Sequence, residues 1–360
     1  MKILVTGGTG FLGRYVVRRL LDAGDFVRVL VRARHKGAAR KHGMNPGLAG
    51  AEEITGDLQD EDSLQRAVQG MDAICHCAAH VQTDSPWKEF EEITVRGTER
   101  LLEAACREGV SRFLHISSLG IYGLDGQGTV TEESSFDDSE KTRGHYTRSK
   151  IEAERLVWKY HRDRNLPVTV VRPGILYGPG RSPFVARLCV PIAPSLTIAV
   201  GRSHQRLSLS YVEDVAEAVH LALRSNRAVG KAYNIVEEGI SQKEYLALLR
   251  RVKLIKGRII LLSPTPLYPL LSLLERLCRW LSITPPVSRH QFERALASLS
   301  YDTSRAREEL GWRPKFGVVE GLMKIRAAME KAGSKEQGAG SKERRAKSEG
   351  QRGLSCRLIV

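Results

Sequence analysis

A glycine-rich turn at the start of the chain constrains the fold more than any other feature. The run Thr6–Gly13 (TGGTGFLG) directly follows a short apolar segment and opens a stretch with helical spacing. In such a turn Gly7 permits the tight bend, Gly10 lets the backbone approach a pyrophosphate, and Gly13 lets helix and strand pack closely. The first turn of the helix then offers free N–H groups and a positive dipole to an anion. The sequence therefore predicts a strand–turn–helix unit that binds a dinucleotide. The residues expected to contact the dinucleotide are Gly7, Thr9, Gly10, Phe11, Leu12 and Gly13.

Strand and helix signals alternate through the first half of the chain. Strands separated by helices predict parallel pairing through right-handed crossovers. We therefore expect an α/β fold, with a doubly wound parallel (Rossmann) sheet and a smaller, mostly helical C-terminal substrate domain. The predicted strands are 2–6, 26–31, 53–55, 73–76, 112–117, 168–171 and 232–236, and the predicted helices are 11–23, 60–69, 87–108, 145–163, 213–223, 242–252 and 267–281.

The character of the sequence changes after Arg172, where Gly and Pro become frequent. We expect a nucleotide-binding domain at 1–172, a substrate-binding region at 173–330 with a strand near 232–236 returning to the sheet, and a basic disordered tail at 331–360. The net charge is +15, but no zinc finger, RNA-binding aromatic motif or helix-turn-helix signature accompanies it, so no nucleic-acid partner is expected. No apolar run reaches the roughly 20 residues that span a bilayer. The six cysteines suit reduced thiols in a cytoplasm, and no metal site is expected.

Residues that follow the other predicted strands indicate how the dinucleotide is held. Arg32 stands after the second strand, with Arg34 two residues on, where an acid would bind the adenosine ribose hydroxyls. A guanidinium can clamp a 2′-phosphate, which favours NADP over NAD while leaving NAD compatible. Asp57 and Leu58 are placed to touch the adenine. Small residues, Ala78 and Ala79, follow the fourth strand and would lie against the cofactor.

A tyrosine and a lysine lie four residues apart at the start of a predicted helix. Residues at this spacing share one helical face, so Tyr146 and Lys150 can point into one site. A nearby positive charge favours the phenolate, which suits a general acid/base for an alcohol–carbonyl pair. Ser117 and Ser118 end the fifth predicted strand, where a hydroxyl can orient the substrate oxygen.

Taken together, these motifs resemble an extended short-chain dehydrogenase/reductase of the NAD(P)-dependent epimerase/dehydratase type. The resemblance runs from Met1 to about Met329. It implies that Ser118, Tyr146 and Lys150 are catalytic, that Lys150 also holds the nicotinamide ribose, and that Pro173, Gly174 and Ile175 touch the nicotinamide carboxamide. It also implies a homodimer formed through the helices at 87–108 and 145–163. The motifs that carry it are Thr6–Gly13, Asp57-Leu58, His76–Ala79, Ser117–Gly123, Tyr146–Lys150, Arg172–Gly180, Tyr211–Ala216 and Leu310–Phe316.

The second half most resembles the 3β-hydroxysteroid dehydrogenase and dihydroflavonol-reductase-like branch of this family. The resemblance implies an oxidoreductase that interconverts an alcohol and a ketone on a mainly apolar substrate, sterol-like or a 3-keto/hydroxy acyl compound. Many sugar-modifying members carry a Thr, Ser or acid two residues after the catalytic serine, where this chain has Gly120, and this disfavours sugar dehydration. Two alternatives remain: a nucleotide-sugar epimerase or reductase, for which Arg202 and Arg206 could hold the phosphates, and a non-catalytic NADP-binding regulatory protein.

Two further expectations concern single segments. The helix at 267–281 is a core helix, a lid over an apolar substrate, or a helix on a membrane surface. The last reading would place a cytoplasmic enzyme at the inner face of a membrane. Cys75 and Cys77 alternate along a buried strand and should point to opposite faces, so they are not expected to form a redox pair.

Overall fold

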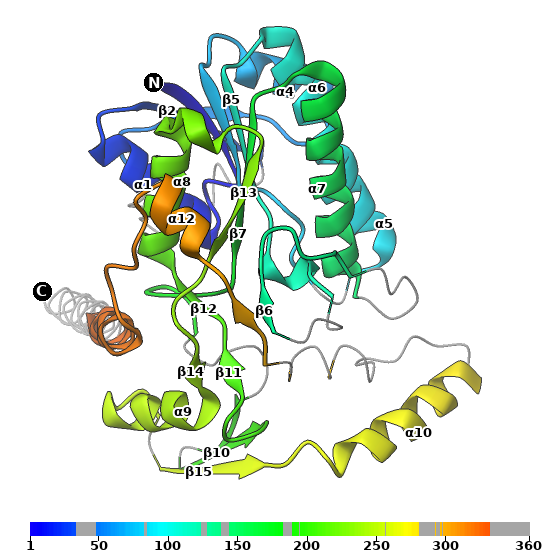
Figure 1. The fold of residues 1–360 in the computed structure, drawn as a ribbon, viewed down its shortest axis with the longest axis vertical. Helices are drawn as coiled ribbons and strands as arrows, with labels where there is room; N and C mark the ends of the chain where they lie inside the picture. Colours follow the sequence, from blue (N-terminus) through cyan, green and yellow to red (C-terminus); the bar gives the residue numbers. More distant parts are fainter. Residues whose placement is uncertain are drawn as a thin grey trace, which may run out of the picture.

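A seven-stranded, wholly parallel sheet forms the centre of the molecule (Figure 1). The computed structural model describes residues 1–33, 48–82, 85–123, 128–137, 144–182, 189–193, 195–255, 257–280, 292, 296 and 298–331. The strand order is β13-β7-β5-β4-β1-β2-β3, so the chain reverses direction across the sheet between β1 and β4. Ligands of such sheets bind at the carboxyl ends of the strands beside this reversal. The strands are β1 (Lys2–Thr6), β2 (Phe26–Val31), β3 (Glu52–Thr55), β4 (Ala73–His76), β5 (Arg112–Ile116), β7 (Val168–Pro173) and β13 (Lys231–Ile235).

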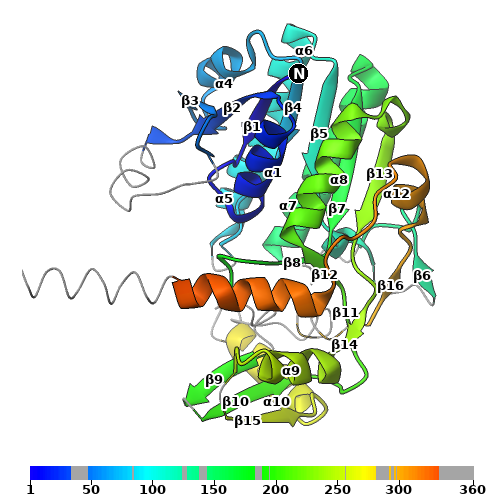
Figure 2. The ribbon, with the colours of Figure 1, turned by 90° about the vertical axis from the view of Figure 1, so that its left-hand side faces the viewer.

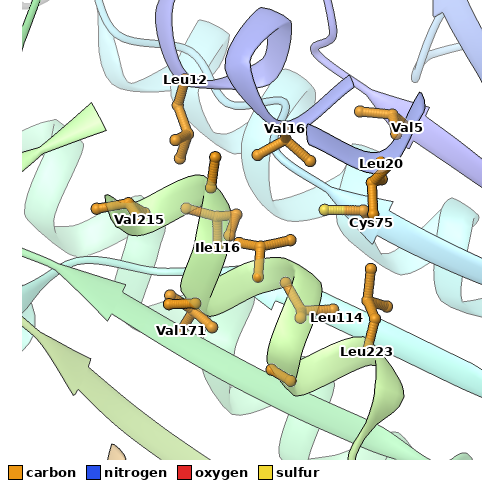
Figure 3. Packing of buried hydrophobic residues seen from close by; sticks show 14 of the residues in the cluster. Val5, Leu12, Val16, Leu20, Cys75, Leu114, Ile116, Val171, Val215 and Leu223 are labelled. Atoms are coloured by element: carbon orange, nitrogen blue, oxygen red, sulfur yellow. The ribbon is translucent and has the colours of Figure 1, made fainter. Parts of the chain in front are cut away.

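Helices cover both faces of this sheet. On one face α1 (Phe11–Asp22) packs against α8 (Val212–Arg224), as Figure 2 shows from the front. Leu12, Val16 and Leu20 of α1 point into a core shared with strand residues (Figure 3). These three recur at helical spacing, which is why this segment forms an amphipathic helix. The other face is covered by α4 (Glu61–Val68), α6 (Gly97–Glu108) and α7 (His145–Arg164).

The helix predicted at 87–108 is interrupted by a change of helical type. It consists of α5 (Trp87–Phe90), a π-helical segment η2 (Glu91–Arg96) and α6. The π segment buries Thr94 in line with Thr98 of α6, whose hydroxyl donates to the Thr94 carbonyl oxygen at 2.5 Å. Such wide turns are frequent near functional sites.

The second half of the chain contributes a smaller lobe at one end of the molecule (Figure 2). Besides helices it contains small sheets that the sequence analysis does not anticipate. β9 (Cys189–Ala193), β10 (Leu196–Val200) and β15 (Arg258–Leu262) form a three-stranded sheet, in which β10 and β15 are far apart in sequence. Two further strand pairs lie in this half: β8 (Ile175–Tyr177) with β12 (Leu209–Tyr211), and β11 (Arg206–Leu207) with β14 (Ile240–Ser241). Its helices include α9 (Gln242–Arg251), α10 (Leu267–Trp280), α12 (Ser304–Glu309) and a helix at 318–331. β16 (Ser300–Tyr301) pairs with β6 (Thr129–Val130) of the first half.

The α/β fold with a doubly wound parallel sheet is confirmed. Arg34 and the tail from residue 332 onward lie outside the described residues. Within the described part of the chain, no helix combines the length and apolar character needed to cross a bilayer.

The expectation that Cys75 and Cys77 point to opposite faces is wrong. Their sulfur atoms lie 3.6 Å apart. β4 ends at His76, so Cys77 has already left the pleated strand and the alternation of faces no longer applies to it. The hydrogen bond with the Cys77 thiol, together with burial, raises the pKa of Cys75 well above its ordinary value.

Candidate active site

The glycine turn forms a close-packed cradle between β1 and α1. Gly7 adopts φ +69°, and a Cβ there would lie 2.7 Å from the Ala78 backbone nitrogen. A Cβ on Gly13 would collide with the Gly7 carbonyl oxygen. Gly10 caps α1 without any side-chain hydrogen bond, which leaves the start of the helix open to an anion. Only glycine satisfies the turn, and the resulting cradle fits a dinucleotide pyrophosphate.

The other residues of the turn divide into open and buried ones. Thr9, Gly10 and Phe11 are at least partly exposed at the mouth of the turn. The side chain of Leu12 is buried in the core between α1, α8 and the sheet, so only its backbone can face a ligand (Figure 3).

The residues expected at the adenosine end lie at the carboxyl ends of neighbouring strands. Arg32 directly follows β2 and is half-buried. Asp57 follows β3 and accepts a hydrogen bond from the Gln59 amide at 3.1 Å. Leu58 turns its side chain into the core beneath α6, where it touches Gly97. Ala78 donates its amide to the Thr6 hydroxyl at 3.4 Å, and with Ala79 it stays partly open.

Tyr146, Lys150 and Ser118 come together where β5 ends and α7 begins. Tyr146 and Lys150 stand one turn apart on α7, and Ser118 begins the short helix η3 (Leu119–Ile121). The hydroxyls of Ser118 and Tyr146 form a side-chain hydrogen bond. The Lys150 ammonium is buried and donates to the Ile116 carbonyl oxygen at 2.5 Å. The Ser118 hydroxyl also accepts from the Gly120 amide at 3.1 Å.

Opposing effects set the acidity of this cluster. Burial raises the pKa of Tyr146, while the hydrogen bond from Ser118 and the charge of Arg181 lower it. Burial lowers the pKa of Lys150 to about 8, and the Glu154 carboxylate opposes that shift. Lys150 is thus a cation at neutral pH that can give up its proton near the working range of an enzyme.

Two buried histidines lie beneath Lys150. His76 is held by Thr6 at 2.7 Å and Thr98 at 2.9 Å, and burial with the Lys150 charge lowers its pKa to about 3. His115 pairs with His76 across β4 and β5, and burial lowers its pKa well below the ordinary value. Neither ring nitrogen of His115 has a hydrogen-bond partner among the described residues. Both rings are therefore neutral, so Lys150 is the only cation among these three side chains.

The segment after β7 closes the site from the other side. The Gly174 amide donates to the Ser210 hydroxyl at 2.8 Å, and a Cβ at Gly174 would collide with the Ser208 carbonyl. Pro173, Gly174 and Ile175 thereby join β7 to β8 at the carboxyl edge of the sheet.

Sequence reasoning missed Arg181. Its guanidinium lies 5.5 Å from the centre of the Phe11 ring, at the start of α1, and its charge acts on Tyr146. It therefore stands between the glycine turn and the tyrosine. The adjoining segment is fastened to α1, because Arg14 Nη2 and the Tyr15 hydroxyl both donate to the Pro179 carbonyl oxygen, at 3.0 and 2.8 Å. No motif signals this contact, since it joins segments more than 160 residues apart.

A buried ionic network behind α7 was also missed. Arg172 pairs with Glu154 at 2.5 Å, and both side chains are almost completely buried. Arg172 also donates to the Tyr122 hydroxyl at 2.6 Å, which in turn donates to Asn234 at 2.7 Å. The network ties α7 to β7 and β13 directly behind the tyrosine and lysine.

The doubly wound sheet, the dinucleotide cradle and the cluster of serine, tyrosine and lysine define a nucleotide-dependent oxidoreductase of the extended short-chain dehydrogenase/reductase class. The model of the NAD dependent epimerase/dehydratase family matches residues 3–236, and the chain belongs to that family.

Relatives with different named activities share most of their length with this chain. It is 27% identical to the 2-alkyl-3-oxoalkanoate reductase of Stenotrophomonas maltophilia, over 91% of this chain and 99% of the relative. It is 31% identical to sterol demethylase protein B of Methylococcus capsulatus, over 87% and 94% of the two chains. Among solved structures, the dTDP-glucose 4,6-dehydratase DesIV of Streptomyces venezuelae, with NAD bound, superposes with a TM-score of 0.70 at 25% identity, covering 92% and 98%.

Proposed function

We propose that this enzyme interconverts an alcohol and a ketone on a mainly apolar substrate, and that Ser118, Tyr146 and Lys150 carry the proton chemistry. The supporting observation is the hydrogen-bonded hydroxyl pair of Ser118 and Tyr146, one helical turn from a buried ammonium and beside the glycine cradle. A bound nicotinamide ring would supply or accept the hydride.

Each member of the proposed triad has a distinct task. In the reducing direction, the carbonyl carbon gains a hydride and Tyr146 gives its hydroxyl proton to the developing alkoxide oxygen. The Lys150 ammonium stabilises the phenolate that remains. One of its three N–H groups donates to Ile116, which leaves donors for the ribose hydroxyls. Ser118 donates to the substrate oxygen, an interaction that is strongest as charge develops there.

The proposed cofactor is NADP. The cradle of Gly7, Gly10 and Gly13 would hold the pyrophosphate, and Arg32 would pair with the 2′-phosphate. Asp57, Ala78 and Ala79 would line the adenosine side, and Pro173–Ile175 the nicotinamide side. Thr9 would contribute from the glycine turn, and Phe11 and Leu12 from the first turn of α1.

The proposed substrate is sterol-like or a 3-keto/hydroxy acyl compound. The names of two relatives, an oxoalkanoate reductase and a sterol demethylase protein, support this class. Gly120 offers no side chain to expel a sugar hydroxyl, which further disfavours dehydration.

A nucleotide-sugar epimerase or reductase is the second candidate. The similarity to DesIV and the exposed side chains of Arg202 and Arg206 favour it. Arg206 already donates to the Gly239 carbonyl at 3.1 Å. Epimerases return the hydride to the same sugar and keep their NAD. Mass analysis of the cofactor released on denaturation therefore separates the two candidates.

We further propose a cytoplasmic homodimer. The outer faces of η2, α6 and α7 form a shallow groove, lined in part by the half-buried side chains of Leu156 and Trp158. Two antiparallel copies of this helix pair would bury these apolar groups. Leu156→Arg is expected to halve the mass observed by sedimentation velocity. An unchanged mass would assign another interface or a monomer.

The proposed function is tested with Tyr146→Phe, which removes one oxygen atom. Turnover of ketone with NADPH should fall by at least about a thousandfold, because the proton donor is lost while the ring remains. NADPH binding, followed by fluorescence, should persist. A variant that retains turnover would remove Tyr146 from the reaction. Failure of the wild type on a broad carbonyl panel despite tight NADPH binding would favour the regulatory alternative.

A further inference from the structure

Exposed apolar side chains gather at one end of the small lobe. Seven of the thirteen large hydrophobic residues that are exposed in the described part of the chain come from β9, β15 and α10. All three elements lie at the lower end of the molecule in Figures 1 and 2. We call this set the basal apolar surface. Its members are Ile192, Ile260, Leu262, Leu270, Leu273, Leu277 and Trp280.

The members on α10 form a single stripe. Leu270, Leu273, Leu277 and Trp280 recur at intervals of three and four residues and are 61%, 54%, 49% and 81% exposed. Such spacing places side chains on one face of a helix. Cys278, by contrast, is buried against the protein. The helix therefore carries apolar residues both on its inner side and on the side exposed to solvent. A helix that serves only as a core element would carry polar residues on its outer face.

The strand that precedes α10 repeats the pattern. Ile259 and Leu261 of β15 pack toward the core of the small lobe, while Ile260 and Leu262 are exposed on the opposite face. A run of four apolar residues therefore supplies both faces of the strand. Ser263–Pro266 then lead directly into α10, so strand and helix form one continuous edge (Figure 1).

The surroundings of this surface are strongly basic. Residues 241–280 contain eight Lys or Arg and two Glu, a net charge of +6 out of +15 for the whole chain. Exposed cations stand on the same elements, Arg258 on β15 and Arg276 on α10, and on the neighbouring α9. Apolar groups bordered by cations are characteristic of helices that lie in the headgroup region of anionic membranes.

We infer that the basal apolar surface docks this enzyme onto an anionic phospholipid bilayer. Trp280 and the three leucines enter the boundary between headgroups and acyl chains, while Arg258 and Arg276 meet lipid phosphates. A second copy of the chain fits less well, because pairing two such faces would bring like charges together. The inference does not depend on the reaction proposed above, although an apolar substrate would concentrate in the same bilayer.

Vesicle flotation of the full chain tests the inference. Binding is expected to vesicles of phosphatidylcholine with about 30% phosphatidylglycerol, and it should weaken at least tenfold on pure phosphatidylcholine or when salt is raised to about 0.5 M. Trp280, the most exposed large apolar side chain among the described residues, should give a blue shift of emission that Trp280→Phe abolishes while binding persists.

Two matched double variants test whether vesicle binding depends on the basal apolar surface or only on positive charge elsewhere on the chain. Leu273→Ser/Leu277→Ser leaves every charge in place, including the basic tail, and should weaken vesicle binding at least tenfold. Met323→Ser/Met329→Ser removes two equally exposed apolar side chains from the helix at 318–331 and should bind like the wild type. Unchanged thermal unfolding and NADPH binding would show that both variants fold.

Any one of the following results would overturn the inference. They are no binding to anionic vesicles at low salt, equal binding of the two double variants, equal binding to neutral and anionic vesicles, and a lipid-free dimer that the leucine variant dissociates. The last would assign the surface to a second copy. Burial of Trp280 by a soluble apolar ketone without vesicles would make α10 a lid and would also overturn it. None of these results depends on the turnover of soluble ketones, so the docking inference and the proposed reaction can be refuted separately.

Discussion

Lys150 and Glu154 lie one turn apart on α7, and both side chains are buried beneath the tyrosine. The charge of the Glu154 carboxylate acts on Lys150, while the carboxylate itself accepts hydrogen bonds from Arg172 and from the Trp158 indole. Burial lowers the pKa of Lys150 to about 8, and Glu154 keeps it from falling further. The acidity of the lysine thus depends on an ionic network that touches neither substrate nor cofactor.

Glu154→Gln should destabilise the protein by about 3–5 kcal/mol, because it leaves the Arg172 guanidinium buried and unpaired. Urea unfolding monitored by circular dichroism measures this loss. Glu152→Gln is the matched control on the same helix, because Glu152 pairs with Arg148 in partly exposed positions and should cost no more than about 0.5 kcal/mol. Similar losses in the two variants would contradict a structural role for the buried pair.

Lys150 should make stability rise with pH in the alkaline range. Its folded pKa of about 8 lies below the ordinary 10.5, so between these values the unfolded chain binds the extra proton. The free energy of unfolding then increases by up to about 1.4 kcal/mol per pH unit. Below pH 8 the lysine is charged in both states and contributes no slope. The measurement is the difference between wild type and Lys150→Met, which cancels the titration of other groups. A pH-independent difference would refute the lowered pKa.

Arg181→Gln should move the alkaline activation of alcohol oxidation to higher pH. The Arg181 charge lowers the pKa of Tyr146, so its removal makes the phenolate harder to form. Rates below the midpoint should fall severalfold, while rates at high pH recover. Arg181→Lys keeps the charge and should retain most of the wild-type profile. A uniform loss of rate at every pH would instead indicate that Arg181 binds a ligand.

Arg32→Ser should reduce the preference for NADPH over NADH by about 10–100-fold in kcat/KM, because a charge-assisted pair with the 2′-phosphate is lost. Arg28, on the strand that Arg32 follows, pairs with Glu52 and donates to the Ala67 and Gln69 carbonyls, so Arg28→Ser serves as a control that should leave the preference unchanged. An unchanged ratio in Arg32→Ser would show that the guanidinium does not read the phosphate.

Local patterns predict the nucleotide-binding part of the fold well. The strands at 2–6, 26–31 and 73–76 have the predicted bounds, because short apolar runs ended by glycine or polar residues leave few alternatives. The glycine turn and the Tyr146–Lys150 spacing are equally local features. Each is encoded within eight residues, and the helix or turn that presents it forms from those same residues.

The features that sequence reasoning missed depend on distant partners. In the sheet of β9, β10 and β15, the pairing of β10 with the distant β15 cannot be predicted from the apolar run of either strand alone. The Glu154–Arg172 pair and the approach of Arg181 to Phe11 are likewise products of tertiary packing. The orientation of Cys77 was misjudged because this residue lies beyond the end of β4, where the alternation of strand faces no longer applies.

A single oxygen atom, the carbonyl of Pro179, fastens the helix that begins at the glycine turn to the segment that carries Arg181. An adjustment of α1 on nucleotide binding would be transmitted to the substrate side through this anchor, without the need for a moving domain. We therefore expect compulsory-order kinetics, in which the nucleotide enters first and leaves last.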